Sequence, residues 1–392
     1  MKTVSLLTRP RLFALAAVAG AALITACGGG GGDSADGSSY AVGRISGFGS
    51  IIVNGVHYDD SRSRVVDDDG QSRGRDDLKL GMVVELRATD FSSSGTPSAT
   101  AQSIEISSLL RGPVDSVAAD TLGVLGQTVK LTATTVVDDS LAGGLAGIRV
   151  GSVLKVYGTL DRTTGVYTAT RIESAAGTSS YRVRGVIGSV DATAKTITIG
   201  TAVIDVSGLA LPAGGLKAGD RVRLRLQTTP NAAGAWVATE LKSGALKIED
   251  SDHAEVEGSI SEFTSTSIFS VDGMPVDATN AVFEDGTAGL ALGARVEVEG
   301  TVVNGVLVAR KVELKSDDDD RSSGFEIDGS ITAADAAAST FVVRNVTVHY
   351  GAGVVFRDGS AANLVAGTRV EVKGTLSADG KTVEATRIEI KR

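Results

Sequence analysis

Hydrophobic and polar residues alternate in short runs along most of this chain. In residues 295–302 valines alternate with charged or polar residues, and a second run rich in valine follows at 305–313. Alternation with a period of two places hydrophobic side chains on one face of a strand and polar ones on the other. The dipeptide Asn304-Gly305 lies between the two runs, and it favours the positive φ angles of a tight hairpin. The pattern predicts two antiparallel strands joined by a hairpin turn.

Three short motifs recur in the same order about every 70 residues. The first is Gly-x-Ile/Val, and the third is Ala-x-x-Ile/Val/Leu-Glu/Lys. The second is a hydrophobic residue, a glycine three positions later and then an alternating strand, as in LVAGTRVEVKG at residues 364–374. A fixed period indicates tandem copies of one structural unit. The glycines of the first motif are Gly43, Gly112, Gly185, Gly258 and Gly329, and those of the second are Gly81, Gly151, Gly219, Gly293 and Gly367.

The motifs and the composition predict five repeats behind an N-terminal targeting region. Residues 1–26 are expected to form a lipoprotein signal peptide, and residues 27–39 a glycine-rich tether. Almost nothing of the remaining chain lies outside the repeats. The expected β-barrel repeats are repeat 1 (40–108), repeat 2 (109–176), repeat 3 (177–248), repeat 4 (249–318) and repeat 5 (319–392).

Each repeat has the pattern of five short strands with a connector between the third and the fourth. Runs of Val, Ile and Thr separated by Gly, Asn and Asp are typical of all-β proteins. Closure into a small OB-like barrel would leave no open sheet edge, and an SH3-like barrel or a small sandwich is the alternative. In repeat 5, Val370 and Val372 should point into the core. Leu364 should fill the base of the barrel from a single helical turn, which Gly367 should end in the left-handed conformation.

The first 27 residues resemble the leader of bacterial lipoproteins. Basic residues precede an apolar stretch at 12–23 that is too short to span a bilayer. The sequence LITAC follows and resembles a lipobox, although an ordinary secretory signal is the alternative. The resemblance implies lipid attachment at Cys27, the only cysteine, with a glycine-rich tether behind it. Gly28 implies an outer-membrane location if the source is Gram-negative, and the cell envelope in any case.

Charge makes nucleic acid an unlikely partner. The chain carries 38 Lys and Arg against 47 Asp and Glu, a net charge of −9, and an acidic body repels phosphate. Aromatic residues, which stack on bases, make up only 4% of the chain. Repeat 3 is basic and repeat 4 strongly acidic, so we predict either that the two faces meet or that both are solvated. The arginines concerned are Arg221, Arg223 and Arg225, and the glutamates are Glu255, Glu257, Glu297 and Glu299.

The residues capable of chemistry do not form a recognisable catalytic pattern. His57, His253 and His349 occupy different places in their repeats. The sequence has no nucleophile elbow, no phosphate-binding loop and no His-Glu-x-x-His motif. We therefore expect no catalytic residue, no metal ligand and no cofactor.

Acidic turns are the strongest candidate for a metal site. In repeat 1 the run Asp67-Asp68-Asp69-Gly70 has part of the spacing of a calcium loop, but Val65 stands at the first ligand position. We expect instead a turn in which an aspartate accepts hydrogen bonds from nearby backbone N–H groups, as aspartates in turns commonly do. Asp317–Asp320 are expected to form a solvated linker between repeats 4 and 5.

The three motifs resemble an uncharacterised domain of bacterial secreted and lipid-anchored proteins, a domain of unknown function. The resemblance covers nearly the whole mature chain and rests on hydrophobic and glycine positions, so it implies a fold and no activity. We predict a non-enzymatic, lipid-anchored envelope protein with a structural or protein-interaction role. Its expected partners are the membrane, through the lipid, and an envelope protein, while the oligomeric state is left open. The alternative is a module that binds a metal ion or a glycan.

Overall fold

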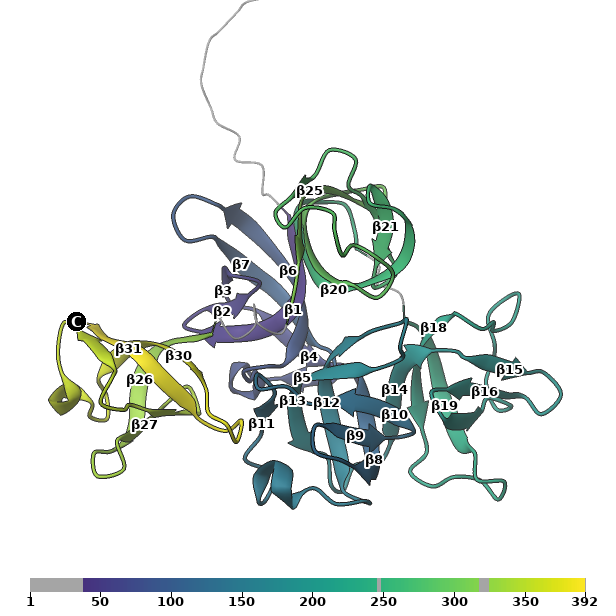
Figure 1. The fold of residues 1–392 in the computed structure, drawn as a ribbon, viewed down its shortest axis with the longest axis horizontal. Coiled ribbons are helices and arrows are strands. Elements are labelled where there is room, and N and C mark those ends of the chain that lie inside the picture. The colour runs from purple at the N-terminus through teal and green to yellow at the C-terminus, as the bar shows by residue number, and fades with distance from the viewer. Residues whose placement is uncertain (1–37, 245–247, 317–323, 392) are drawn as a thin grey trace, which may run out of the picture. The chain divides into compact units, whose positions relative to one another are not determined.

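β-Strands dominate the structure, as the alternating pattern predicts. The computed structural model describes residues 38–244, 248–316 and 324–391 (Figure 1). Helical structure within these ranges is limited to three 3-10 turns, η1 (Arg75–Asp77), η2 (Gly144–Gly147) and η3 (Ala361–Asn363). Cys27 and the Asp317–Asp320 linker lie outside the described residues. No helix in the described ranges is long and apolar enough to cross a membrane.

Residues 39–106 form a closed five-stranded barrel. β1 pairs with β2 and with β6, and β7 pairs with β6 in antiparallel and with β3 in parallel orientation. Since β2 also pairs with β3, the ring closes in the order β1-β2-β3-β7-β6. The strands are β1 (Ser39–Phe48), β2 (Ile51–Val53), β3 (Val56–Asp59), β4 (Arg64–Asp67), β5 (Ser72–Arg73), β6 (Val83–Ser92) and β7 (Ser98–Ile106).

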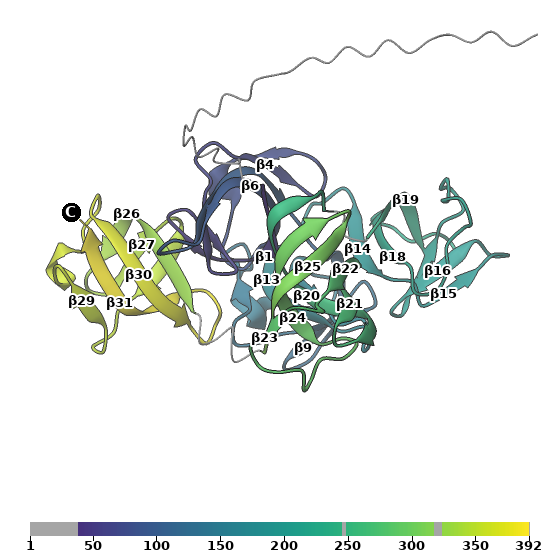
Figure 2. The same ribbon diagram turned by 90° about the horizontal axis from the view of Figure 1, so that it is seen from above.

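The same ring order recurs in segments 110–174, 251–314 and 325–391, and the last of these lies at the yellow end of the colour scale in Figure 2. Segment 110–174 contains β8 (Leu110–Val117), β9 (Thr121–Val124), β10 (Gln127–Lys130), β11 (Val136–Val137), β12 (Val153–Leu160) and β13 (Tyr167–Ser174). Segment 251–314 contains β20 (Ser251–Ser265), β21 (Ile268–Val271), β22 (Met274–Asp277), β23 (Val282–Phe283), β24 (Arg295–Val303) and β25 (Val306–Leu314). Segment 325–391 contains β26 (Phe325–Asp335), β27 (Thr340–Val343), β28 (Val346–His349), β29 (Val355–Arg357), β30 (Arg369–Leu376) and β31 (Val383–Lys391).

Segment 181–243 follows this order with one interruption. Its first strand is divided into β14 and β15, of which β14 pairs with β18 and β15 pairs with β16. The parallel pairing of the third and fifth strands is kept between β17 and β19. The strands are β14 (Tyr181–Val186), β15 (Ser189–Asp191), β16 (Thr196–Ile199), β17 (Ala202–Asp205), β18 (Arg221–Leu226) and β19 (Trp236–Ser243).

The first and second sequence motifs are hydrogen-bonded to each other. In segment 325–391 the N–H of Gly367 donates to the carbonyl of Ile331, and the N–H of Ile331 donates to the carbonyl of Thr368, both at 2.8 Å. The five glycines of the second motif all have positive φ, between 77° and 92°, a conformation that is costly for a residue with a Cβ atom. The two motifs therefore recur together because each repeat forms the same backbone hydrogen bond between them. The other pairs are Gly81 with Ile45, Gly151 with Val114, Gly219 with Ile187 and Gly293 with Ile260.

The prediction for the helical turn of repeat 5 is only partly correct. Leu364 is buried, with 5% of its surface exposed, directly after η3. However, η3 ends at Asn363, and Gly367 lies in a separate tight turn closed by a 3.1 Å hydrogen bond from the Thr368 N–H to the Val365 carbonyl. The glycine has the expected left-handed conformation, but it redirects the chain into β30 instead of ending the helical turn.

The core and the hairpins agree with the sequence pattern. Val370 and Val372 are fully buried, and Lys373 is exposed on the outer face. The hairpin between β24 and β25 turns at Asn304 and Gly305, whose φ angles are 52° and 75°. The predictions of the buried valines and of the hairpin turn are confirmed. Both depend only on a few neighbouring residues, which the sequence shows directly.

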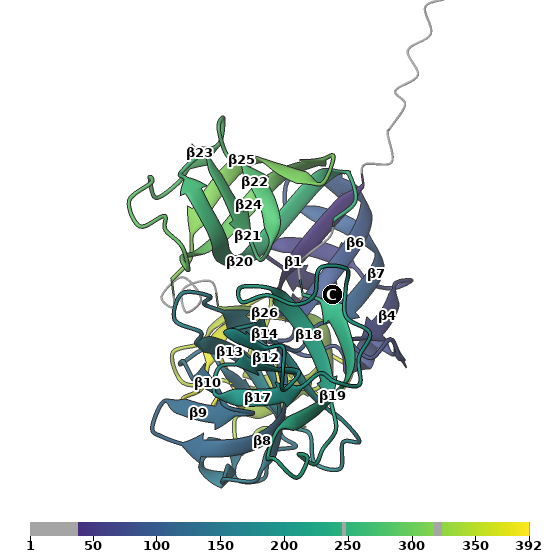
Figure 3. The ribbon, with the colours of Figure 1, turned by 90° about the vertical axis from the view of Figure 1, so that its right-hand side faces the viewer.

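First strands also pair between segments. β1 runs parallel to β20, with Ser39–Val42 against His253–Val256 (Figure 3), and it pairs with β26 further along. β8 pairs with β14 in antiparallel orientation. An unpaired strand edge exposes backbone N–H and carbonyl groups. These contacts cover parts of the first strands that their own barrels leave open.

Candidate functional site

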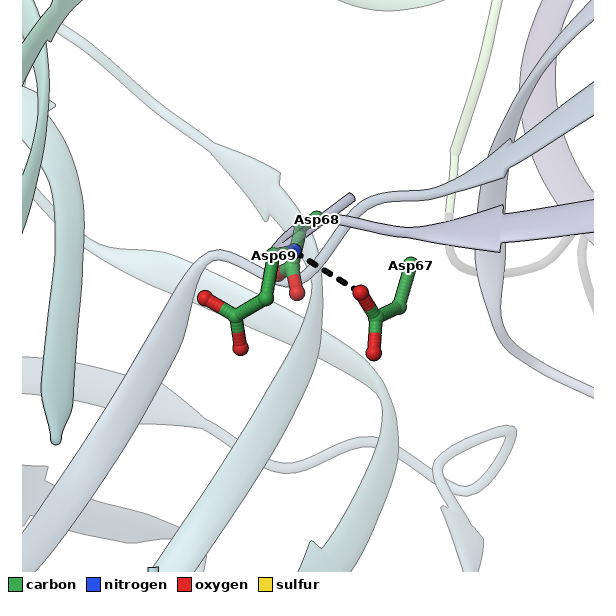
Figure 4. Close-up of side chains that lie close together, drawn as sticks. All are labelled: Asp67, Asp68 and Asp69. Atoms are coloured by element: carbon green, nitrogen blue, oxygen red, sulfur yellow. Dashed lines mark hydrogen bonds between the residues drawn. The ribbon is translucent and has the colours of Figure 1, made fainter. Parts of the chain in front are cut away.

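The acidic turn of repeat 1 brings three carboxylates together. Asp67, Asp68 and Asp69 follow one another at the end of β4, and one oxygen of each lies within 4.8 Å of the others (Figure 4). Asp67 Oδ1 accepts hydrogen bonds from the N–H groups of Asp69 and Gln71, both at 2.9 Å. Its Oδ2 accepts a 2.9 Å hydrogen bond from Arg73 Nε. The prediction that an aspartate of this turn bonds nearby backbone N–H groups is confirmed at Asp67, and this residue shapes the turn.

Asp68 is a buried carboxylate with a partner in another segment. Its side chain is 1% exposed and forms an ion pair with Arg182 of β14, whose side chain is 3% exposed. The N–H of Ser108 donates to Asp68 Oδ2 at 3.1 Å, and the Ser108 hydroxyl donates to the same oxygen. Burial alone would raise the pKa of Asp68, but the charges of Arg182 and Lys155 and these hydrogen bonds outweigh it and lower the pKa to about 2. Asp68 is therefore ionised at neutral pH.

Asp69 connects three segments. Its Oδ2 lies 2.8 Å from Arg111 Nη1 of β8, and its Oδ1 lies 2.7 Å from Arg225 Nη2 of β18. Arg182 contacts the same carboxylate. Burial opposes ionisation, but the hydrogen bond from Arg111 and the charge of Arg182 lower the pKa of Asp69. A single turn of segment 39–106 thus binds arginines of segments 110–174 and 181–243.

The charge balance of this turn favours a structural junction over a metal site. Among the described residues it is the only group of three or more His, Cys, Asp or Glu side chains close enough to share a metal ion. Calcium requires six to eight oxygen ligands, whereas the cations that contact these carboxylates are guanidinium groups. A metal ion would have to displace several arginines, including the buried Arg182.

The prediction that the three arginines of repeat 3 face Glu255, Glu257, Glu297 and Glu299 of repeat 4 is wrong, because each arginine pairs with a different carboxylate. Arg225 contacts Asp69, and Arg223 lies 3.4 Å from Glu105, both in segment 39–106. Only Arg221 reaches segment 251–314, and it does so at Asp272, at 3.1 Å.

The physical reason is that three of those four glutamates have cations of their own segment beside them. Glu257 pairs with Arg295 on the neighbouring strand. Glu299 lies 2.6 Å from Arg310, and Glu297 lies 3.1 Å from Lys315. Cross-strand pairs of opposite charge form readily on one sheet face, so the nearest cations to these three carboxylates come from repeat 4.

Glu255 and Glu297 form a buried acid pair that the sequence pattern did not predict. They lie on the neighbouring strands β20 and β24 and are 6% and 9% exposed. Burial and the adjacent Glu297 raise the pKa of Glu255, and burial also raises that of Glu297, against the charge of Lys315. Alternation correctly assigns both residues to the outer face of their barrel. It contains no signal that this face is covered by another segment.

The three histidines lie on different strands, β3, β20 and β28. His253 is 4% exposed and stacks on Phe91 with ring centroids 3.5 Å apart. Burial and the charge of Arg310 lower the pKa of His253 to about 4, so its ring is neutral at pH 7. His349 Nδ1 lies 2.6 Å from Glu384 Oε2. Each histidine has a local environment of its own and none belongs to the carboxylate group of the acidic turn.

Hollows occur where segments meet. One, of about 390 Å³, is lined by residues of segments 39–106 and 251–314 together with Gly324 and Glu326. A smaller cavity of about 40 Å³ is lined by residues of four segments, among them Glu85, Arg184 and Arg221. A ligand in either space would contact several segments at once, instead of a pocket that belongs to one repeat.

Three parts of the chain are similar to a family described as a domain of unknown function (DUF5666), at residues 111–173, 257–313 and 328–389. Each matched range contains all three sequence motifs, from the first glycine to the final acidic residue. No curated protein matches the chain.

Proposed function

We propose that this protein is a non-enzymatic lipoprotein of the cell envelope, in which five tandem barrels of OB-like topology form a body with a structural or protein-interaction role. The observation that carries the proposal is the use of charge. The most buried ion pair described above, Asp68 with Arg182, joins segments instead of lining a cavity. Its expected partners are the membrane and an envelope protein.

The OB-like topology is supported by the order of the strands. The third and fifth strands run parallel in each segment, as β28 and β31 do, and the first strand contacts both the second and the fourth. The turns η1, η2 and η3 each lie between the third and the fourth strand of a segment. A barrel of consecutive antiparallel strands would not contain the parallel pair, which favours the OB-like order over an SH3-like one.

The residues that differ between repeats support a role without catalysis. Outward residues of the fourth strand face other segments: Glu85 of β6 lies 3.4 Å from Arg184, and Arg223 of β18 lies 3.4 Å from Glu105. Residues that vary from repeat to repeat are therefore used to join the repeats. A common catalytic centre would instead require chemically equivalent groups around a shared pocket.

A lipid anchor at Cys27 would lie only a short way along the chain from β1. Ser38 is held at the start of β1, because its carbonyl accepts hydrogen bonds from the His253 N–H at 3.1 Å and from the Ser251 hydroxyl at 2.9 Å. Residues 28–37 would connect the lipid to this point. In a Gram-negative source the anchor would lie in the outer membrane.

Replacing Cys27 with serine should abolish fatty-acyl labelling and leave the leader unprocessed at the lipobox, because serine lacks the thiol that receives the lipid. The measurement is metabolic labelling with a fatty acid, together with the distribution of the chain between membrane and soluble fractions. The control is Ser34→Ala, which changes the tether but keeps the thiol and should remain labelled. Persistent labelling of the Cys27→Ser chain would contradict the anchor.

A further inference from the structure

The contact between β1 and β20 contains a buried acid. Ser39–Val42 pair in parallel with His253–Val256, and we call this contact the β1–β20 seam. Glu255 lies in its middle, opposite Ala41. The seam also holds Ser38, the first described residue after the proposed tether. Opening of the seam would therefore release Ser38, the residue at which the proposed tether would meet the folded body.

Glu255 is buried beside other carboxylates of β20 and β24. Its Oε2 is buried without a hydrogen-bond partner among the described residues. Glu297, a second carboxyl group that is 9% exposed, lies on the neighbouring strand, and its charge raises the pKa of Glu255 further than burial alone. Burial and the charges of both glutamates raise the pKa of Tyr58 of β3, which is fully buried. Two carboxylates that lie close together and are largely buried repel each other strongly when both are ionised.

One lysine pairs with Glu297 itself, and both lysines near the two glutamates also contact other carboxylates. Lys315 is shared between Glu297 and Glu313, at 3.1 and 3.0 Å. Lys311 lies 2.9 Å from Glu284 and 3.2 Å from Glu313. The charged and titratable groups near the pair are Glu257 and His253 on β20, Arg295 and Glu299 on β24, Arg310, Lys311, Glu313 and Lys315 on β25, and Arg44 and Tyr58 on segment 39–106.

We propose that Glu255 and Glu297 share one proton at neutral pH, and that this proton keeps the β1–β20 seam closed. Loss of the proton would place two negative charges side by side within the seam. Separation of β20 from β1 would then admit water to both carboxylates, so the seam would open as the pH rises.

The direction of the pH dependence follows from the raised pKa values of Glu255 and Glu297. A carboxyl group whose pKa is raised by folding stabilises the folded form most below the ordinary pKa of glutamate. That contribution is lost as the pH rises through the raised pKa of the pair. Across this interval the closed seam holds one proton more than the open seam. Its opening constant should therefore rise up to about 10-fold per pH unit.

The consequence for the protein is proton-dependent attachment of the tether to the body. When the seam is closed, Ser38 is bound by the start of β20. When it opens, β1 keeps its antiparallel contact with β6 but loses β20. The relation to a membrane rests on the proposed lipid anchor, whereas the shared proton and the opening of the seam do not depend on it.

Hydrogen exchange of the full chain tests the seam directly. After correction for the intrinsic exchange rate, amides of β1 and β20 in the seam should lose protection, by up to about 10-fold per pH unit between about pH 6 and about pH 9. Amides of β30 should show no such loss. Glu255→Gln keeps the shape and donates a hydrogen bond to Glu297, so its seam should stay protected across this range. Glu262→Gln, an exposed change on the same strand, should behave as the wild type.

Two further results decide the proposal independently of whether the Glu255→Gln chain folds. Infrared spectra of the wild type should contain a protonated carboxyl band at neutral pH, and Glu297→Gln should change that band. An absent band, or seam protection that does not depend on pH in the wild type, would overturn the proposal. Equal pH dependence in Glu255→Gln and the wild type would also overturn it. Acyl labelling at Cys27 is unaffected by any of these outcomes, so failure here is separable from failure of the proposed function.

Discussion

Replacing Arg182 with methionine should destabilise the protein by about 3–5 kcal/mol, the usual range when one partner of a buried ion pair is removed. Methionine keeps much of the apolar length of the side chain but leaves Asp68, 1% exposed, without its counterion. Asp68 must then remain charged with only the charge of Lys155 and the hydrogen bonds from Ser108, or take up a proton. Urea unfolding of the full chain at neutral pH measures the loss.

The matched control is Arg87→Met. Arg87 pairs with Glu249 at 2.6 Å, but the two side chains are 48% and 82% exposed, so its loss should change stability by at most about 1 kcal/mol. Adding Asp68→Asn to Arg182→Met should recover part of the lost stability, because the uncompensated charge disappears. If Arg182→Met proves as mild as Arg87→Met, the acidic turn does not hold the segments together.

Acid should reduce the effect of Arg182→Met. The pKa of Asp68 is lowered in the folded protein to about 2, so its contribution is present above the ordinary pKa of aspartate and is lost as the pH falls through that lowered value. The difference in unfolding free energy between wild type and Arg182→Met should therefore shrink in acid. A difference that stays constant from neutral pH to about pH 2 would point to lost packing instead of lost charge.

Gly81→Ala should destabilise the protein more than Gly367→Ala, although the two glycines occupy equivalent positions in their repeats. Their φ angles are 77° and 92°, so both substitutions carry the conformational penalty of about 1–2 kcal/mol. A Cβ atom on Gly81 would also lie 2.5 Å from the carbonyl oxygen of Thr170, whereas one on Gly367 would have nothing within 4 Å. Displacing the neighbouring strand should add about 1–3 kcal/mol.

The comparison isolates the contact between segments 39–106 and 110–174. The Thr170 hydroxyl donates to the Gly81 carbonyl at 2.7 Å, and Arg171 Nη1 donates to the Leu80 carbonyl at 3.0 Å. Both bonds cross from one segment to the other. Thermal unfolding of the two variants measures the difference, and Gly151→Ala, with open space around the new methyl group, serves as a second control. Equal losses in all three variants would show that the close approach at Gly81 is not needed for stability.

The fold was predictable from the sequence where structure depends on near neighbours. Val370 and Val372 alternate with polar residues, and Asn304-Gly305 tolerates positive φ at both turn positions. Each of these signals is complete within about ten residues. Because the motifs recur at a fixed period, the strands predicted for one repeat could be expected in the other repeats as well.

The site was not predictable from the sequence. A polar residue on the outer face of a strand produces the same alternating pattern whether that face is exposed to water or packed against another segment. Asp69 and Arg182 are 113 positions apart, and Tyr157 is fully buried on a face that alternation assigns to solvent. The expected contact of Arg223 with repeat 4 assumed that adjacent repeats use adjacent faces. Pairing of β14 with β8 instead joins repeats 2 and 3 through their first strands, and Arg223 contacts repeat 1.

The hydrogen bonds between the first and second motifs lie inside each unit, while the contacts that differ from unit to unit lie outside. Copies of an ancestral unit could therefore diverge on their surfaces without losing the ability to fold. The surface charges of each unit then match those of its own neighbours, and so suit that unit to one position in the chain. Exchanging two units within the chain would leave every barrel able to close, yet the exchanged units would meet neighbours whose charges do not match theirs. The residues that do not repeat therefore determine which units contact each other, and so fix the order in which the units must follow along the chain.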